Sequence, residues 1–195
     1  ESFIYIVLLC LIAFLILFQF NKLTIILGMS SMILVFGYPF MKRITYWPQL
    51  FLGLTFNWGI IMGWTSITNS ISIEPIILYL SAIFWTLGYD TIYGFQDIRD
   101  DEIIGTKSTS IKFKNNPKLF VGACYSLCVL FILILFFVMK IDKYLLALST
   151  LLILTLIYQI KIFKINNPSS CLVAFRFNNI TGFFVFLFIF SFNIL

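Results

Sequence analysis

Seven long apolar segments, separated by short breaks that are polar or contain proline, dominate this sequence of 195 residues. Each is close to the roughly 20 residues that a helix needs to cross the hydrocarbon core of a bilayer. The segments lack the alternation with period two that is typical of a membrane β-barrel. Because a chain in lipid must pair its backbone polar groups internally, the segments predict transmembrane helices. They cover residues 3–20, 23–40, 48–67, 75–93, 118–139, 143–163 and 172–193.

The composition argues against a soluble fold. Apolar residues make up 61% of the chain, charged residues only 11%, and the mean hydropathy is +1.04. A soluble domain usually carries about 25% charged residues. We therefore expect an all-α, polytopic transmembrane helical bundle with about seven spans, in which residues 1–195 form a single transmembrane domain.

The basic residues predict how this bundle is oriented. With seven spans, ten of the thirteen basic residues fall on the side that carries the connection 94–117, and three fall on the other. The positive-inside rule then places this connection in the cytoplasm. The net charge of +5 follows from this topology and does not indicate nucleic-acid binding. The ten are Lys42, Arg43, Arg99, Lys107, Lys112, Lys114, Lys118, Lys161, Lys164 and Arg176.

The connection 94–117 is long for a link between two helices, and long loops in compact domains are usually functional or disordered. Together with Asp90 at the end of the preceding span, it holds five of the eight acidic residues of the chain. If that span continues as a helix for two more turns, side chains three, four and seven positions apart share one face. We expect such a face to carry Asp90, Tyr93, Asp97 and Asp101.

Carboxylates gathered in this way repel one another unless a cation neutralises them. Hard oxygen ligands that leave room for water and phosphate suit Mg²⁺, so we expect Asp97, Asp100 and Asp101 to be metal ligands. The following segment, Gly105 to Thr109, offers a lysine, hydroxyl groups and backbone N–H groups that can hold phosphate oxygens. The alternative interpretation is a solvated loop whose charges serve solubility.

Three motifs in this order resemble a known family. They are the run from Tyr38 to Thr45 (YPFMKRIT), the run from Tyr89 to Thr109 (YDTIYGFQDIRDDEIIGTKST), and the run from Ala174 to Gly182 (AFRFNNITG). The chain resembles the UbiA superfamily of intramembrane aromatic prenyltransferases, most closely its bacterial 4-hydroxybenzoate polyprenyltransferases. This resemblance implies a bundle of nine helices with two aspartate-rich loops that hold Mg²⁺ against a prenyl diphosphate.

The resemblance also implies that part of the site lies outside this sequence. Asp97 and Asp101 match the second aspartate-rich motif, but the first, which begins with Asn-Asp, has no match, since that dipeptide is absent. The seven segments would be helices three to nine of the family. We therefore expect an N-terminally truncated chain, which agrees with a first residue other than Met. Whether it acts alone or needs a complementing N-terminal chain stays open.

The implied reaction is transfer of a polyprenyl group from polyprenyl diphosphate to the ring of 4-hydroxybenzoate, a step of ubiquinone biosynthesis, in the bacterial inner membrane. The resemblance assigns catalytic roles to Asp90, Arg43 and Tyr93. It assigns diphosphate binding to Lys107, Arg43, Lys42 and Asn178. Arg43 is a candidate for either a benzoate carboxylate or a phosphate oxygen, and Asn178 for either a substrate contact or a bond between helices.

Two alternatives remain from the sequence alone. A neighbouring prenyltransferase would act on another acceptor, such as a quinone precursor or haem, because the acceptor assignment depends only on the motif matches. A membrane transporter would also use charged residues within its spans. Against a transporter, the acidic residues gather at one membrane face and the chain shows no internal repeat.

Overall fold

The computed structural model describes residues 2–140 and 143–191, and the regular structure within them is helical. An isolated bridge between Lys164 and Asn167 is the one extended pairing in this part of the chain. The helices are α1 (Ser2–Leu17), α2 (Lys22–Ile44), α3 (Pro48–Phe56), α4 (Gly59–Thr68), α5 (Ile73–Gly94), α6 (Ile98–Ile104), α7 (Thr109–Lys112), α8 (Pro117–Met139), α9 (Lys143–Ile162), α10 (Pro168–Arg176) and α11 (Asn178–Ser191).

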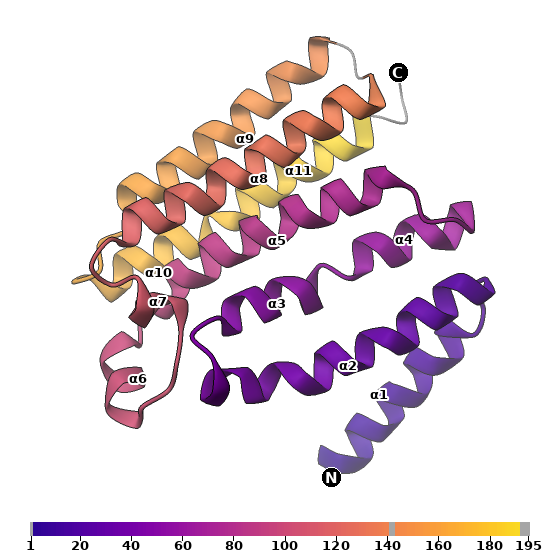
Figure 1. Ribbon diagram of the computed structural model, residues 1–195, viewed down its shortest axis with the longest axis horizontal. Helices are drawn as coiled ribbons and strands as arrows, with labels where there is room; N and C mark the ends of the chain where they lie inside the picture. The colour runs from indigo at the N-terminus through magenta and orange to yellow at the C-terminus, as the bar shows by residue number, and fades with distance from the viewer. Residues whose placement is uncertain (1, 141–142, 192–195) are drawn as a thin grey trace.

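The long helices run side by side along one direction, and α5 lies in the middle of the bundle (Figure 1). It packs against α8 on one side, against α3 and α4 on another, and against α10 behind. The outer helix α1 contacts α2, while α9 packs against α8 and α11. The short helices α6 and α7 lie together at one end of the bundle, where the α2–α3 connection also lies.

The prediction of an all-α membrane bundle is confirmed. Five segments in the described part of the chain are long and apolar enough to cross a bilayer: Lys22–Ile44, Pro48–Thr68, Ile73–Gly94, Pro117–Met139 and Pro168–Phe190. The other two expected spans correspond to shorter apolar helical stretches, Ile4–Leu17 and Ser149–Ile162. The chain is thus an integral membrane protein, and helix covers most of the described residues of each of the seven expected segments.

Two of the expected spans need a correction, because they are broken rather than continuous. The span over 48–67 divides into α3 and α4 at Asn57, and the last span divides into α10 and α11 at Phe177. Asn57 stabilises the first break, since its side-chain amide donates to the carbonyl of Gly53 at 2.9 Å. Hydropathy averaged over a whole span does not reveal such breaks, because the residues on both sides are apolar.

Proline and asparagine set the ends of several helices. Pro48, Pro117 and Pro168 occupy the first turns of α3, α8 and α10, where a missing N–H leaves no bond unmade. The side chain of Asn21 caps α2 by accepting from the N–H of Thr24 at 3.0 Å. These local signals place the helix starts close to the positions that the sequence predicts.

Close packing of α5 against α8 forms the centre of the bundle. Gly88 lets the Tyr125 ring lie on the backbone of α5, because a Cβ at this position would come within 2.4 Å of the ring. Cys128 lies one helical turn from Tyr125 on α8, and its carbonyl accepts from the buried hydroxyl of Ser81 on α5 at 2.9 Å. Lipid is as apolar as the side chains, so such contacts and interhelical hydrogen bonds, rather than hydrophobic burial, hold the helices together.

We predict that Gly88→Ala destabilises the protein by about 1–3 kcal/mol, because the added Cβ would overlap the ring of Tyr125, which is buried and hydrogen-bonded. Unfolding in detergent measures the effect. Gly122→Ala on α8 is the matched control, since a Cβ there meets no atom within 4 Å. Equal unfolding midpoints for the two variants would contradict the close α5–α8 packing.

Candidate functional site

The acidic loop starts with a break in the helix. α5 ends at Gly94, the N–H groups of Phe95 and Gln96 bond back to Ile92 and Tyr93, and α6 begins at Ile98. The expectation that the span continues for two more turns is therefore wrong. Asp90 and Tyr93 belong to α5, whereas Asp97 and Asp101 lie on a separate turn, in which the N–H of Asp101 donates to the carbonyl of Asp97 at 2.9 Å.

The carboxylates at this turn differ in their partners. Glu102 forms an ion pair with Lys114 at 2.6 Å. The side chains of Asp97, Asp100 and Asp101 form no hydrogen bond or ion pair with other described residues, and the first two are exposed. Oxygen ligands left free in this way fit Mg²⁺. Within residues 2–140 and 143–191, however, no three acidic or cysteine side chains lie close enough to hold an ion, so further ligands would have to complete the site.

The segment that follows the acidic turn is attached to the end of α2. The N–H of Lys107 donates to the carbonyl of Lys42 at 2.8 Å, and the ammonium of Lys107 donates to the carbonyl of Ile44 at 3.2 Å. The same ammonium lies 5.7 Å from the centre of the Tyr46 ring. Lys107 therefore sits beside Lys42, the other lysine predicted to bind diphosphate.

Buried polar contacts fix the start of α7 beneath this segment. The side-chain oxygen of Gln49 accepts from the N–H of Thr109 at 2.9 Å, and the Thr109 hydroxyl bonds to that of Thr91 at 2.6 Å. Ser110 donates to the carbonyl of Thr91 at 2.8 Å, against Gly94. Gln49 is thus a site-shaping residue that the sequence prediction missed, although a lone glutamine in an apolar span is itself a signal.

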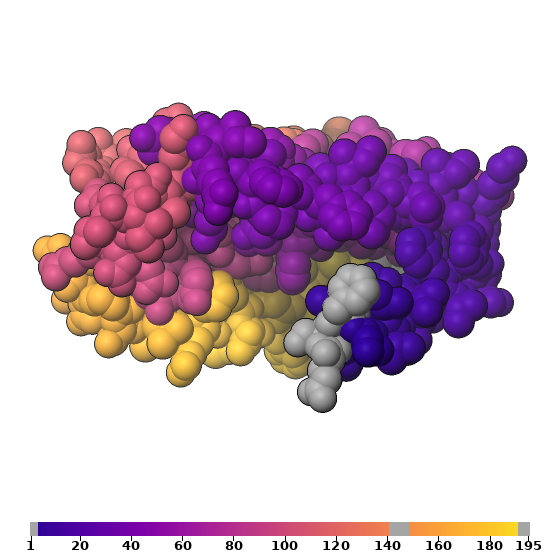
Figure 2. Space-filling model, turned by 90° about the horizontal axis from the view of Figure 1, so that it is seen from below, coloured from indigo at the N-terminus to yellow at the C-terminus, as the bar shows by residue number. Residues whose placement is uncertain are grey.

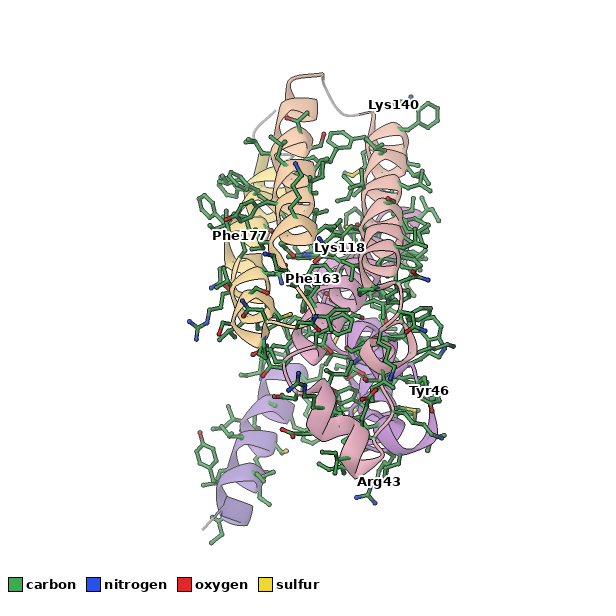
Figure 3. All side chains as sticks on the ribbon, turned by 90° about the vertical axis from the view of Figure 1, so that its left-hand side faces the viewer. Arg43, Tyr46, Lys118, Lys140, Phe163 and Phe177 are labelled. Carbon is green, nitrogen blue, oxygen red and sulfur yellow. The ribbon has the colours of Figure 1, made fainter. Side chains whose placement is uncertain are left out.

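Asp90 faces α2 rather than the acidic turn. It is partly buried and interacts electrostatically with Lys42 and with Tyr38, both on α2. Arg43 follows Lys42 but is exposed, and its side chain points away from the helices at the end of the molecule opposite Lys140 (Figure 3). The structure therefore attaches Lys107 to the end of α2, leaves Asp90 without a direct ion pair among the described residues, and leaves the guanidinium of Arg43 open to solvent.

Aromatic rings form a continuous line from the acidic end toward the middle of the bundle. Trp85, Tyr89 and Tyr93 follow one another at four-residue spacing on α5, so they share one face. The ring centres of Trp85 and Tyr89 are 5.8 Å apart. Phe175 of α10 lies 4.6 Å from Tyr93 and 5.8 Å from Tyr89. We call these four residues the aromatic ladder.

A cavity of about 300 Å³ opens at the inner part of the ladder. It lies where the breaks in both interrupted spans face α5, and we call it the aromatic cavity. Its wall consists of Phe56, Asn57, Trp85, Thr86, Tyr89, Phe175, Arg176, Asn178 and Asn179. A cavity with aromatic walls and a few polar groups suits a small aromatic molecule that carries polar substituents.

Asn178 has a different position from the one predicted for a diphosphate contact. It lies on the wall of this cavity, separated from Lys42 and Lys107, which do not line it. Its side-chain oxygen accepts from the indole N–H of Trp85 and from the amide of Gln159, both at 3.1 Å. Asn178 therefore joins helices and also lines the cavity, while a substrate contact stays a prediction.

A family model described as the UbiA prenyltransferase family matches residues 1–190. The chain belongs to the UbiA prenyltransferase family. It is 44% identical to a human and 43% identical to a bovine mitochondrial 4-hydroxybenzoate polyprenyltransferase, in each case over 86% of this chain and 45% of the relative.

A corresponding Arabidopsis thaliana protein is 53% identical over 54% of this chain and 26% of the relative. The chain thus spans about half the length or less of these curated UbiA relatives. No solved structure matches it. The family assignment made from the three motifs is confirmed.

We predict that Gln49→Leu loosens the segment from Gly105 to Lys112, because the buried N–H of Thr109 loses its acceptor. Hydrogen exchange of the Thr109 amide in detergent should become about tenfold faster or more. Gln19→Leu is the control, since Gln19 is exposed in the turn after α1 and makes only a 3.5 Å contact with the carbonyl of Leu15. Unchanged exchange in Gln49→Leu would contradict the role of Gln49.

Proposed function

We propose that this chain carries out, or contributes to, the transfer of a polyprenyl group from polyprenyl diphosphate to a ring carbon of 4-hydroxybenzoate. The observation that carries the proposal is the aromatic ladder, which leads from an exposed group of free carboxylates and lysines into a cavity of the size of a small aromatic acid. The names of the mitochondrial relatives support the same donor and acceptor.

The residues at the acidic end are suited to the diphosphate. We assign Asp97, Asp100 and Asp101 to Mg²⁺, and Lys42 and Lys107 to the diphosphate oxygens. Bound Mg²⁺ would neutralise the negative charge that the leaving diphosphate gains. The two lysines add fixed positive charge at the same place. Arg43 remains a prediction for a substrate anion, and its exposed guanidinium has no protein partner among the described residues.

The ladder is suited to the prenyl group itself. When the C–O bond breaks, its electron pair leaves with the diphosphate and an allylic cation remains. The faces of Tyr93 and Tyr89 offer this cation the negative part of an aromatic quadrupole. The acceptor ring then supplies the pair for the new C–C bond and loses a proton from the same carbon to water; Asp90, which does not line the aromatic cavity, stays a prediction for this role.

The two alternatives, a transporter and a prenyltransferase for another acceptor, are not equally supported. Membership of a prenyltransferase family, together with the gathering of five of the eight acidic residues at one end of the bundle, favours the enzyme over a transporter. Another acceptor, such as a quinone precursor or haem, would use the same donor chemistry. The cavity of about 300 Å³ favours a single-ring acid over the much larger haem.

We predict product when the chain is co-expressed in membranes with an N-terminal part that bears the Asn-Asp motif, and supplied with 4-hydroxybenzoate, polyprenyl diphosphate and Mg²⁺. Asp97→Asn should lower the rate by about 100-fold or more, because a free metal ligand is lost. Glu102→Gln is the control, since Glu102 is already paired with Lys114 on the surface. Equal loss in both variants, or no product from the unsubstituted chain, would refute the proposal.

We also propose that the acidic end faces the cytoplasm of a bacterial inner membrane, because ten of thirteen basic residues lie on that side. A cysteine at Glu102 (Glu102→Cys) should react with a membrane-impermeant maleimide from the cytoplasmic side only. A cysteine at Lys140 (Lys140→Cys), at the opposite end of the molecule, should react from the other side only (Figure 3). The reverse pattern would invert the orientation.

A further inference from the structure

A glutamine with no exposed surface lies at the centre of a hydrogen-bond network that ends on the aromatic cavity. Gln159 of α9 is 0% exposed, although glutamine in an apolar span is unusual. Its side-chain oxygen accepts from the hydroxyl of Tyr125 on α8. Its amide donates to the side chains of Asn178 at 3.1 Å and Thr181 at 2.9 Å, both on α11. One side chain therefore connects three helices.

The direction of every bond in this network follows from Trp85. An indole N–H only donates, so the Asn178 atom 3.1 Å from it must be the side-chain oxygen. The Gln159 atom that meets the same oxygen must then be its amide nitrogen. This leaves the Gln159 oxygen facing Tyr125, whose hydroxyl must donate. The orientation of both amides is thus determined by the partners alone.

This order has a consequence for the cavity wall. The oxygen of Asn178 receives two donors from inside the protein, and one of its amide hydrogens is given to the carbonyl of Phe175 at 2.9 Å. Its remaining polar capacity is a single N–H. Because Asn178 lines the aromatic cavity, that N–H is the group it has left for a ligand, and it suits an acceptor such as a carboxylate or phenol oxygen.

We propose that Gln159 is a positioning residue for the acceptor: it holds Asn178 so that the free N–H of Asn178 is presented to a hydroxyl or carboxyl oxygen of the aromatic substrate. This inference rests on the proposed prenyl transfer and names a residue of the acceptor site. Gln159 itself does not line the cavity and touches no reacting atom. Its effect passes through Asn178.

Two features separate this role from simple attachment of helices. Asn178 and Trp85, the two residues joined at the shared oxygen, both line the cavity, whereas Thr181, the other acceptor of Gln159, does not. In addition, the Tyr125 ring packs directly on Gly88 of α5, so the hydrogen bond from Tyr125 to Gln159 starts from a side chain that is packed on the central helix. A network built only for stability has no need to end on the wall of a cavity.

The test is steady-state kinetics of the co-expressed membrane preparation, with donor and acceptor varied separately. Gln159→Met keeps the volume and removes the hydrogen bonds. We expect the KM for 4-hydroxybenzoate to rise about tenfold, while the KM for polyprenyl diphosphate stays within about twofold. Thr181→Val removes one bond of the same glutamine away from the cavity, and it should leave the acceptor KM unchanged. Equal acceptor KM in Gln159→Met and the unsubstituted chain overturns the inference.

A double substitution then tests whether Gln159 changes the acceptor KM through Asn178. If Gln159 acts through Asn178, adding Gln159→Met to Asn178→Ala should raise the acceptor KM no further. Additive effects overturn the inference.

Gln159→Met is combined with Tyr125→Phe if the single variant fails to fold. The combination removes both partners of the buried hydrogen bond, so that neither the glutamine oxygen nor the tyrosine hydroxyl is left unpaired, and the same KM pattern is expected. Absence of transfer by the unsubstituted chain marks failure of the proposed function instead.

Discussion

Polar groups inside an apolar bundle have to find partners within the protein, and this constraint determines how the helices meet around α5. Lipid offers no hydrogen bonds, so each buried hydroxyl or amide must lie opposite a specific partner. Thr86 receives the amide of Asn57, and Thr91 bonds to Thr109. The first pair fixes how the break between α3 and α4 is turned toward α5, and the second fixes α7 in the same way. A shift of one residue along either helix would leave the polar atoms unpaired.

The two broken spans obey the same constraint. A break frees backbone carbonyl groups, and irregular backbone at membrane depth persists only where the protein or a cavity satisfies it. The side-chain nitrogen of Asn57 at the first break lies 2.8–3.3 Å from three acceptors, and Asn178 follows directly after the second break. Because both breaks face the stretch of α5 around Trp85, they leave the aromatic cavity between them. The cavity is therefore a result of how the breaks are stabilised.

The sequence was sufficient to predict the helical segments, the acidic loop and the family, because these depend on patterns that are local or recur in order. It was insufficient for the end of α5 at Gly94, since the pattern of residues 90–101 is equally compatible with a longer helix. The roles of Gln49 and Gln159 were also missed. A single glutamine in an apolar span indicates that a partner exists, but the partner lies 60 residues away in one case and 19 to 34 in the other.

The order of chemical groups along α5 gives the proposed reaction a physical basis. Figure 2 shows the segment around α6 at one end of the molecule, next to α10. The charged side chains of Asp97, Arg99 and Asp100 are exposed there. Ionisation of a diphosphate needs such a polar, cation-rich surface, whereas an allylic cation needs protection from water. Tyr93 stands between the two environments, 40% exposed and in contact with Phe175. Leaving group and cation would thus separate along the ladder, and an acceptor held at Asn178 would meet the cation at the inner part of the ladder, where the aromatic cavity opens.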